Sequence, residues 1–203
     1  MFERSQISLS FTLLLAICCS ITFVLTDYDI VDVRELFNYD SNLILKGQVY
    51  RFISYPLAHE GLLHLLVNLL VFIPLGLCYE RYLKNPKIFL YTLFLVFSFI
   101  PAFLCFLGSF LLLELKELSL IGCSGWCFIL SVWLAKRYSS RMSYNYSAKR
   151  LIQFFPILLL IFYSVVLPES TFMGHVACIL FGYLFSNGFL DHMIPTSEYS
   201  VIE

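Results

Sequence analysis

The sequence predicts an all-α protein whose helices cross the membrane several times. Of its 203 residues, 60% are hydrophobic and only 13% are charged, about half the charged share of a soluble domain. The mean hydropathy of the chain is +0.83. Six apolar segments follow one another, each close to the ~20 residues that a helix needs to cross ~30 Å of hydrocarbon. We expect the spans at residues 7–26, 62–79, 88–107, 118–135, 151–167 and 171–190.

The first of these segments also has features of a signal peptide, because Arg4 precedes it. Its apolar stretch is longer than that of a usual signal sequence, and no small-x-small cleavage site follows. We therefore expect it to be retained as the first span. Residues 1–190 then form one six-helix membrane domain, followed by a short polar tail at 191–203.

The basic residues predict which side of the membrane each loop faces. Six spans place both termini on one side, and the loops of that side hold nine of the 13 Lys and Arg residues, with four on the other. The positive-inside rule then places both termini in the cytosol. The loop at residues 27–61 lies on the opposite side. It is too long for a simple connection, so we expect it to carry structure of its own.

Composition argues against several other classes of protein. The net charge of −1 gives no indication of nucleic-acid binding. The seven cysteines lie in or beside apolar segments and lack the spacing of a metal site or of a disulfide framework. We interpret them as small buried side chains, and we expect no metal or cofactor.

Polar side chains on three different segments fall at one depth of the membrane. Ser124, Asn68 and His175 each lie twelve residues from the cytosolic edge of their segment, which is ~18 Å along a helix. His64 lies one turn above Asn68. A single polar residue at this depth is typical of a hydrogen bond between helices. Four such groups with complementary chemistry indicate a functional site.

The chemistry of these four residues fits nucleophilic catalysis. A serine needs a base to take its proton, and a neutral histidine is the usual one, so Ser124 and His175 are the candidate nucleophile and base. His64 and Asn68 are spaced i, i+4 and share a helix face, so both side chains can stabilise an oxyanion, together with the backbone N–H of Ser124. No carboxylate lies at the depth of His175, so the sequence predicts a Ser-His dyad.

Small residues favour a close approach of the two helices that carry the dyad. One stripe of small residues lies beside His175 and another beside Ser124, and such stripes let membrane helices pack closely. Ordinary packing without catalysis explains the stripes equally well. Their members are Gly174, Cys178, Gly182 and Ser186 on one helix, and Cys123, Cys127, Ser131 and Ala135 on the other.

A run that begins at His59-Glu60 and ends at His64 is similar to the HExxH motif of zinc proteases, but it has one residue too many. Five residues rotate a helix by about 500°, which leaves the two histidines about 140° apart. On this argument they do not share a helix face, and we expect no zinc site.

Several short motifs follow one another between residues 50 and 182. They are Tyr50-Arg51, His59, the HxxxN run from His64 to Asn68, the GxSG run from Gly122 to Gly125, and Gly174-His175 with Gly182. In type and order these motifs resemble those of the rhomboid family of intramembrane serine proteases. The runs around Ser54–His59, Gly122–Phe128 and Gly174–Val176 are similar to the fungal, Golgi-type rhomboids in particular.

The resemblance implies a six-helix core with Ser124 at the foot of a water-filled cavity. Ser124 is then the nucleophile, His175 the general base and acid, and His64 and Asn68 line the oxyanion hole. Gly122 and Gly125 support the nucleophile. The implied substrates are single-pass membrane proteins with helix-weakening residues near the cut. In the fungal subgroup, a membrane-tethered, sterol-responsive transcription factor is a candidate substrate, and a Golgi membrane the expected location.

Three positions depart from the family's pattern. Phe128 stands where the family often has tyrosine, so it can pack on the imidazole but offers no hydroxyl. Cys178 stands where a glycine is expected, which weakens the tightest helix contact. Tyr50 replaces the tryptophan of the first-loop Trp-Arg pair. None of these changes removes a catalytic group, so we expect an active enzyme.

Two other functions compete with the protease. A catalytically silent, rhomboid-like adaptor would bind membrane helices for trafficking or degradation, but it has no use for the complete set of four site residues. A small transporter could use serine and histidine as a polar relay, but the sequence has no inverted repeat or pair of interrupted helices to favour it.

Overall fold

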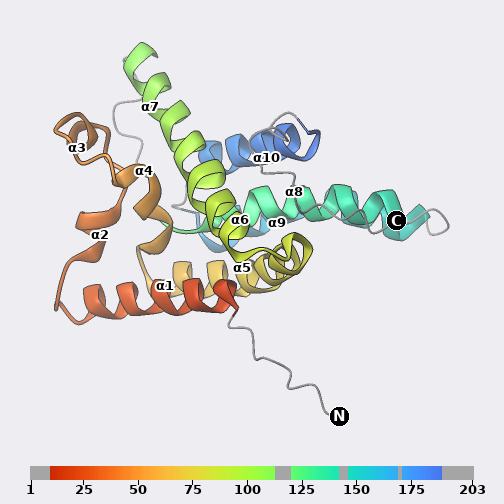
Figure 1. Cartoon of the computed structure of the whole chain (residues 1–203), viewed down its shortest axis with the longest axis horizontal. Helices are drawn as coiled ribbons and strands as arrows, with labels where there is room; N and C mark the ends of the chain where they lie inside the picture. Colours follow the sequence, from red (N-terminus) through yellow and green to blue (C-terminus); the bar gives the residue numbers. More distant parts are fainter. Residues whose placement is uncertain (1–9, 113–119, 142–145, 169–170, 189–203) are drawn as a thin grey trace, which may run out of the picture.

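The helices of this chain cross one another in a bundle, with one helix, α8, running through its middle (Figure 1). The computed structural model describes residues 10–112, 120–141, 146–168 and 171–188. Within these ranges the structure is helical and has no strand; one isolated bridge pairs Tyr39 with Leu120. The prediction of an all-α fold is confirmed.

The helices follow in the order expected, with short ones between the first two long ones. Two further turns lie between numbered helices: a 3₁₀ turn at Tyr55–Leu57 and a π-helical stretch at Thr92–Phe99 that joins α6 to α7. The helices are α1 Phe11–Asp27, α2 Val33–Phe37, α3 Ser41–Leu45, α4 Arg51–Ser54, α5 Leu62–Leu83, α6 Pro86–Tyr91, α7 Ile100–Leu112, α8 Ser124–Arg141, α9 Tyr146–Val166 and α10 Phe172–Ser186.

The helices differ from the expected spans mainly at their ends. The helix expected at 118–135 begins only at Ser124, because Gly122 has a φ of +90° that a helix cannot include. At its other end it runs on to Arg141. The segment expected at 88–107 is longer, since Asn85 caps α6 by accepting the N–H groups of Lys87 and Ile88. Residues 7–9, 118–119 and 189–203 lie outside the described ranges.

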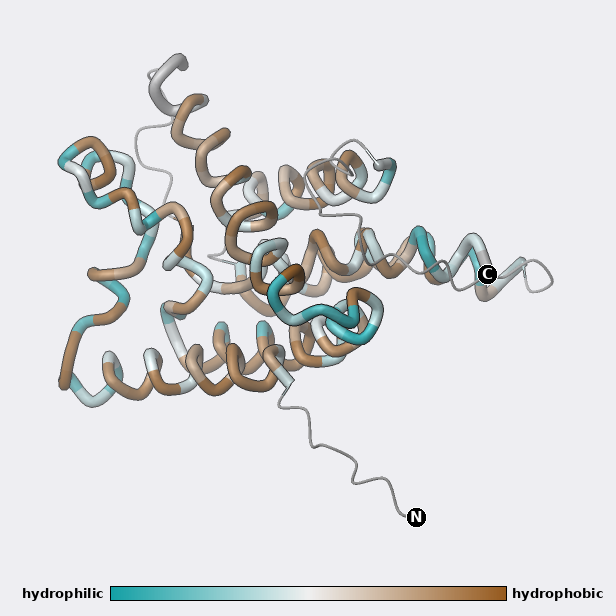
Figure 2. The backbone as a smooth tube through the Cα atoms, in the orientation of Figure 1, coloured by the Kyte–Doolittle hydropathy of each residue, from teal (hydrophilic) through white to brown (hydrophobic). Residues whose placement is uncertain are grey.

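Among the residues that the structure describes, three helices are long and apolar enough to cross a membrane, and two shorter helices are also apolar. The apolar colour dominates these helices, while polar residues gather in the turn after α5 and in the segment from α2 to α4 (Figure 2). The chain is therefore a multi-pass membrane protein, and the count of six spans stays a prediction. The long helices are Leu62–Leu83, Pro86–Gly108 and Tyr146–Val166, and the shorter ones are Phe11–Asp27 and Phe172–Ser186.

The start of α1 is fixed to the end of α5 by one carboxylate. Glu80 accepts hydrogen bonds from the backbone N–H groups of Phe11 and Thr12 at 2.8 and 3.0 Å. The hydroxyls of Ser10 and Thr12 donate to it as well, at 2.8 and 2.7 Å. These N–H groups have no partner inside the helix, and a negative charge is favoured at a helix N-terminus. Glu80 thus caps α1 and holds it against α5.

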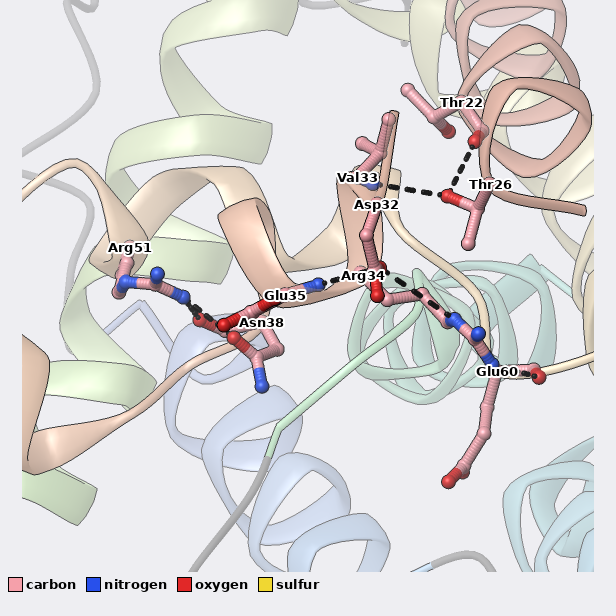
Figure 3. Close-up of polar contacts among 9 residues, drawn as sticks. All are labelled: Thr22, Thr26, Asp32, Val33, Arg34, Glu35, Asn38, Arg51 and Glu60. Atoms are coloured by element: carbon pink, nitrogen blue, oxygen red, sulfur yellow. Dashed lines mark hydrogen bonds and ion pairs between the residues drawn. The ribbon is translucent and has the colours of Figure 1, made fainter. Parts of the chain in front are cut away.

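The segment between α1 and α5 carries structure of its own, as the sequence predicts. Its short helices are held by polar contacts (Figure 3). Arg51 is buried, and its guanidinium donates to Asn38 through both the backbone carbonyl, at 2.7 Å, and the side-chain oxygen, at 2.5 Å. A third bond joins its Nε to Gln48 at 2.7 Å. Thr26 at the end of α1 accepts the N–H of Val33 at 3.1 Å, which sets the direction of α2.

The core lies around α8, which packs against α5, α9 and α10 and the π-helical stretch. Its two tryptophans lie seven residues apart, on one face of the helix, and both pack against α5. Trp126 meets Phe72 at 5.3 Å between ring centroids, and Trp133 meets Tyr79 at 4.8 Å. The indole N–H of Trp126 donates to Ser98 at 2.8 Å, so the buried polar end of the ring has a partner. Because lipid is as apolar as these side chains, such packing and hydrogen bonds hold the helices together.

Candidate active site

The candidate nucleophile Ser124 is the first residue of α8. The turn before it is made by Gly122, whose φ of +90° is strained for any residue with a side chain. The Gly122 N–H donates to the carbonyl of Tyr55 at 3.0 Å, which anchors the turn to the first-loop segment. The N–H groups at the start of a helix have no partner within that helix, so the Ser124 N–H is a candidate donor to a ligand.

The candidate base His175 lies on α10, one turn from its start, and reaches Ser124. Its Nε2 lies 3.1 Å from the Ser124 Oγ, which is hydrogen-bonding distance. Both side chains are buried, each 6% exposed. When the neutral ring carries its proton on Nδ1, Nε2 is free to accept the proton of the Ser124 hydroxyl, as a general base requires.

His64 and Asn68 of α5 lie beside the turn that precedes Ser124. A methyl group on Gly122 would lie 2.9 Å from His64 Nε2 and 3.2 Å from Asn68 Nδ2, so both side chains press against this turn. Asn68 is fully buried, and its Nδ2 has no hydrogen-bond partner among the described residues. A buried donor without a partner is uncommon in proteins, and it is what an anion-binding site leaves open for its ligand.

Two aromatic rings surround the imidazole of His175. Phe128, one turn after Ser124, lies 4.5 Å from it between ring centroids, tilted by 33°. Tyr163 of α9 meets it edge to face at 5.5 Å. Phe128 therefore packs on the imidazole as expected. The sequence analysis did not identify Tyr163. It lies 13 residues from Arg150, ~20 Å along its helix and so near the depth of the site, but a tyrosine at this depth is not unusual in an apolar segment.

The small residues allow α8 and α10 to approach closely. A methyl group on Gly182 would lie 3.2 Å from the Cα of Ile129 and 3.0 Å from Val132 Cβ, so the two backbones are nearly in contact there. Nearer the dyad, a methyl group on Gly125 would lie 3.4 Å from Cys178 Sγ, which is a close van der Waals contact. Cys178 thus fills the space opposite Gly125. Gly174, at the end of the stripe, has a looser setting, facing Thr171.

Ser124, His175 and His64 line a cavity of about 1030 Å³. The rest of its lining includes residues from the start of α5, from α7, from the end of α9 and from the start of α10. The walls are mostly apolar, with residues such as Leu104, Val166 and Met173. The cavity is large enough for an extended peptide segment to reach the serine.

The geometry corrects the argument made from the sequence about His59 and His64. His59 lies before α5 and not on it, so the helical rotation of 140° does not apply. The two rings in fact meet edge to face, at 5.3 Å. Within the described residues no group of three or more His, Cys, Asp or Glu side chains is placed to hold a metal ion.

His59 instead supports the turn that carries the nucleophile. Its Nε2 lies 3.4 Å from the backbone N–H of Cys123 and 3.6 Å from the thiol of the same residue. Burial, with a smaller contribution from the neighbouring His64, lowers the pKa of His59 to about 3. The ring is therefore neutral at physiological pH, and a neutral ring can accept the Cys123 N–H.

Comparison with known proteins places the chain in a family. The model of the Rhomboid domain matches residues 46–192, which is most of the chain. The chain therefore belongs to the rhomboid family, a family of intramembrane serine proteases. The resemblance stated from the sequence motifs is confirmed.

Individual relatives come mainly from fungi. The chain is 28% identical to Rhomboid-type serine protease 2 of Yarrowia lipolytica over 166 residues, 80% of this chain and 54% of the relative. It is 33% identical to the protein of the same name from Saccharomyces cerevisiae, over 74% of this chain and 58% of that one. Rhomboid-like protein 15 of Arabidopsis thaliana matches at 27% over 90% of this chain. The chain spans about half the length of the curated relatives it matches.

Proposed function

We propose that this chain is an active intramembrane serine endopeptidase that works through a Ser124–His175 dyad. The observation that supports this most strongly is the 3.1 Å contact between Ser124 Oγ and His175 Nε2, made by two buried residues that come from different helices and line one cavity. Membership of a serine protease family supports the same chemistry.

The first half of the reaction forms an acyl-enzyme. His175 takes the proton of Ser124 as the hydroxyl oxygen attacks the carbonyl carbon of the substrate peptide bond. Negative charge then develops on the carbonyl oxygen, where Asn68 Nδ2, His64 and the Ser124 N–H are candidates to donate to it. As the intermediate collapses, His175 gives its proton to the leaving amine.

The second half regenerates the enzyme. Water from the cavity attacks the acyl-enzyme, with His175 again as the base, and the serine leaves with the proton. Within the described residues, His175 makes no ion pair with a carboxylate. Phe128 and Tyr163 pack against its ring and hold its orientation, the role that an aspartate has in a triad.

The proposed substrates are single-pass membrane proteins, cut within or beside their membrane-spanning segment. The apolar cavity walls favour such segments over soluble peptides. The similarity to fungal relatives supports a membrane-tethered, sterol-responsive transcription factor as one candidate. We also propose that both termini lie in the cytosol and that the enzyme resides in the Golgi or another endomembrane, on the grounds of the basic loops and of this similarity.

The experiment compares three purified proteins in lipid on one single-span substrate. Wild type cleaves it, and Ser124→Ala abolishes cleavage and labelling by a fluorophosphonate. Ser131→Ala is the matched control, because it removes another buried serine hydroxyl from the same helix, one that donates to the Phe128 carbonyl at 2.7 Å. The control retains cleavage.

The silent adaptor predicts a different result. An adaptor would bind the substrate equally well in all three proteins and cut it in none. Cleavage that persists in Ser124→Ala, or a fluorophosphonate label that survives this change, contradicts the choice of nucleophile.

A further inference from the structure

We propose that Tyr163 is a positioning residue of this active site, which orients the Asn68 side chain so that its amide group donates to the oxyanion. The inference deepens the proposed function and rests on it. Tyr163 belongs to α9, which carries none of the four site residues identified from the sequence.

The contact is a buried hydrogen bond between helices α9 and α5. The Tyr163 hydroxyl donates to Asn68 Oδ1 at 2.8 Å, and the tyrosine ring and the asparagine side chain are both fully buried. Water is thus unable to replace either partner. Because Asn68 Oδ1 accepts this hydrogen bond, the amide oxygen is held toward Tyr163 and the Nδ2 group points the other way.

The other end of the amide is then directed at the site. Asn68 Nδ2 faces the turn at Gly122, close to His64, and has no partner among the described residues. Without the tyrosine hydroxyl, the amide can rotate by a half turn, which would present an oxygen to the developing negative charge. An acceptor there repels the oxyanion that a donor stabilises.

The tyrosine ring has a second role in the same place. It lies edge to face on His175 and at 5.0 Å from Phe128. Phe128 provides an aromatic surface for the imidazole but has no hydroxyl, while Tyr163 provides both an aromatic edge and a hydroxyl. One side chain therefore contacts the candidate base and the candidate oxyanion donor, which lie on different helices.

The test is Tyr163→Phe, which removes the hydroxyl and keeps the ring. We expect kcat to fall about tenfold, the effect of one lost hydrogen bond, with KM little changed, because the oxyanion exists only after binding. Rates are expressed per active site, titrated to completion with a fluorophosphonate, so a smaller folded fraction does not affect them. Tyr79→Phe is the matched control, since it removes another buried tyrosine hydroxyl, from a ring that packs against Trp133. Its kcat stays at the wild-type value.

A double-mutant cycle separates positioning from general stabilisation. Asn68→Ala lowers kcat by about 10²–10³, as expected for loss of an oxyanion donor. In that background Tyr163→Phe causes no further loss, because there is no amide left to orient. An equal tenfold loss in both backgrounds overturns the inference, and so does a change in KM alone. Cleavage that Ser124→Ala abolishes and Tyr163→Phe leaves at the wild-type rate overturns this inference while the proposed function stands.

Discussion

The first-loop segment and the candidate active site hold their buried polar groups in opposite ways. In the loop segment, Arg51 is buried and its guanidinium makes three hydrogen bonds, to Asn38 and Gln48. In the site, Asn68 is equally buried, but its Nδ2 has no partner among the described residues. A satisfied network rigidifies a structure, while an unsatisfied donor costs stability. The loop segment is built for stability, and the site leaves a donor open for a ligand.

The glycine turns of the two regions offer the sharpest test of this difference. Gly47 in the loop segment and Gly122 in the site both have positive φ, at +98° and +90°. A methyl group on Gly47 meets nothing within 4 Å, whereas one on Gly122 overlaps the His64 ring at 2.9 Å. We expect Gly122→Ala to lower kcat by about 10²-fold or more, because it displaces His64 and Asn68, the candidate oxyanion donors.

Gly47→Ala is the control for backbone strain alone. It costs about 1–2 kcal/mol of stability, and cleavage per active site stays at the wild-type rate. Thermal unfolding in detergent and cleavage of a single-span substrate, both measured on each variant, check the two effects. Equal losses of cleavage in the two variants would mean that strain, and not displacement of His64 and Asn68, is responsible.

The charge buried in the loop segment gives a second test, with a smaller effect. Arg51→Ala leaves the Asn38 and Gln48 oxygens without their donor, so we expect the free energy of unfolding to fall by about 2 kcal/mol. Cleavage per active site should change much less, because the hydrogen bonds that Arg51 makes within the described residues go to Asn38 and Gln48, in the first-loop segment. Arg34→Ala is the matched control, since Arg34 is exposed and its pair with Asp32 at 4.0 Å is weak. A larger effect on kcat than on stability would contradict this division of roles.

The last expected effect concerns pH, and it is small for a change of a single pH unit. The usual pKa of histidine is about 6.5, and burial lowers that of folded His59 to about 3. Between these values the unfolded chain binds a proton that the folded chain does not, so stability is complete above pH 6.5 and falls as the pH is lowered. We expect a loss of about 1 kcal/mol per pH unit in this window, attributable to His59.

His59→Asn tests this attribution, because asparagine does not titrate in this range. The unfolding temperature of the variant, measured from pH 6.5 to pH 4.5, should depend less on pH than that of wild type. The same slope in both proteins would assign the acid sensitivity to other groups.

Much of the fold could be predicted from the sequence because it depends on local patterns. Apolar segments of about 20 residues predict membrane helices whatever their packing. The helix predicted at 118–135 begins later than predicted, at Ser124. Hydropathy does not reveal the positive φ of Gly122, which prevents the helix from starting before it. The assumption that His59 lies on the same helix as His64 was wrong, because that helix begins three residues after His59. The expectation of no zinc site stays a prediction.

The candidate site divides in the same way. Ser124, His175, His64 and Asn68 carry chemistry that is expensive in a membrane, so their types and depths single them out from sequence alone. Tyr163 does not stand out in this way, since tyrosine is common in apolar segments. Its importance comes from a partner 95 residues away in the chain, which only packing brings within 2.8 Å.

By itself, therefore, the sequence determined that this is a helical membrane protein with a serine, a histidine and an amide at one depth. It could do so because hydrophobic length and the cost of buried polar groups are properties of individual segments. Only the tertiary structure decided that Ser124 lies 3.1 Å from His175, that Gly122 presses on His64, and that Asn68 faces the site with its Nδ2. These depend on how α5, α8, α9 and α10 pack. The pattern along one helix can indicate a close-packing face, but it does not specify which residue of another helix lies opposite.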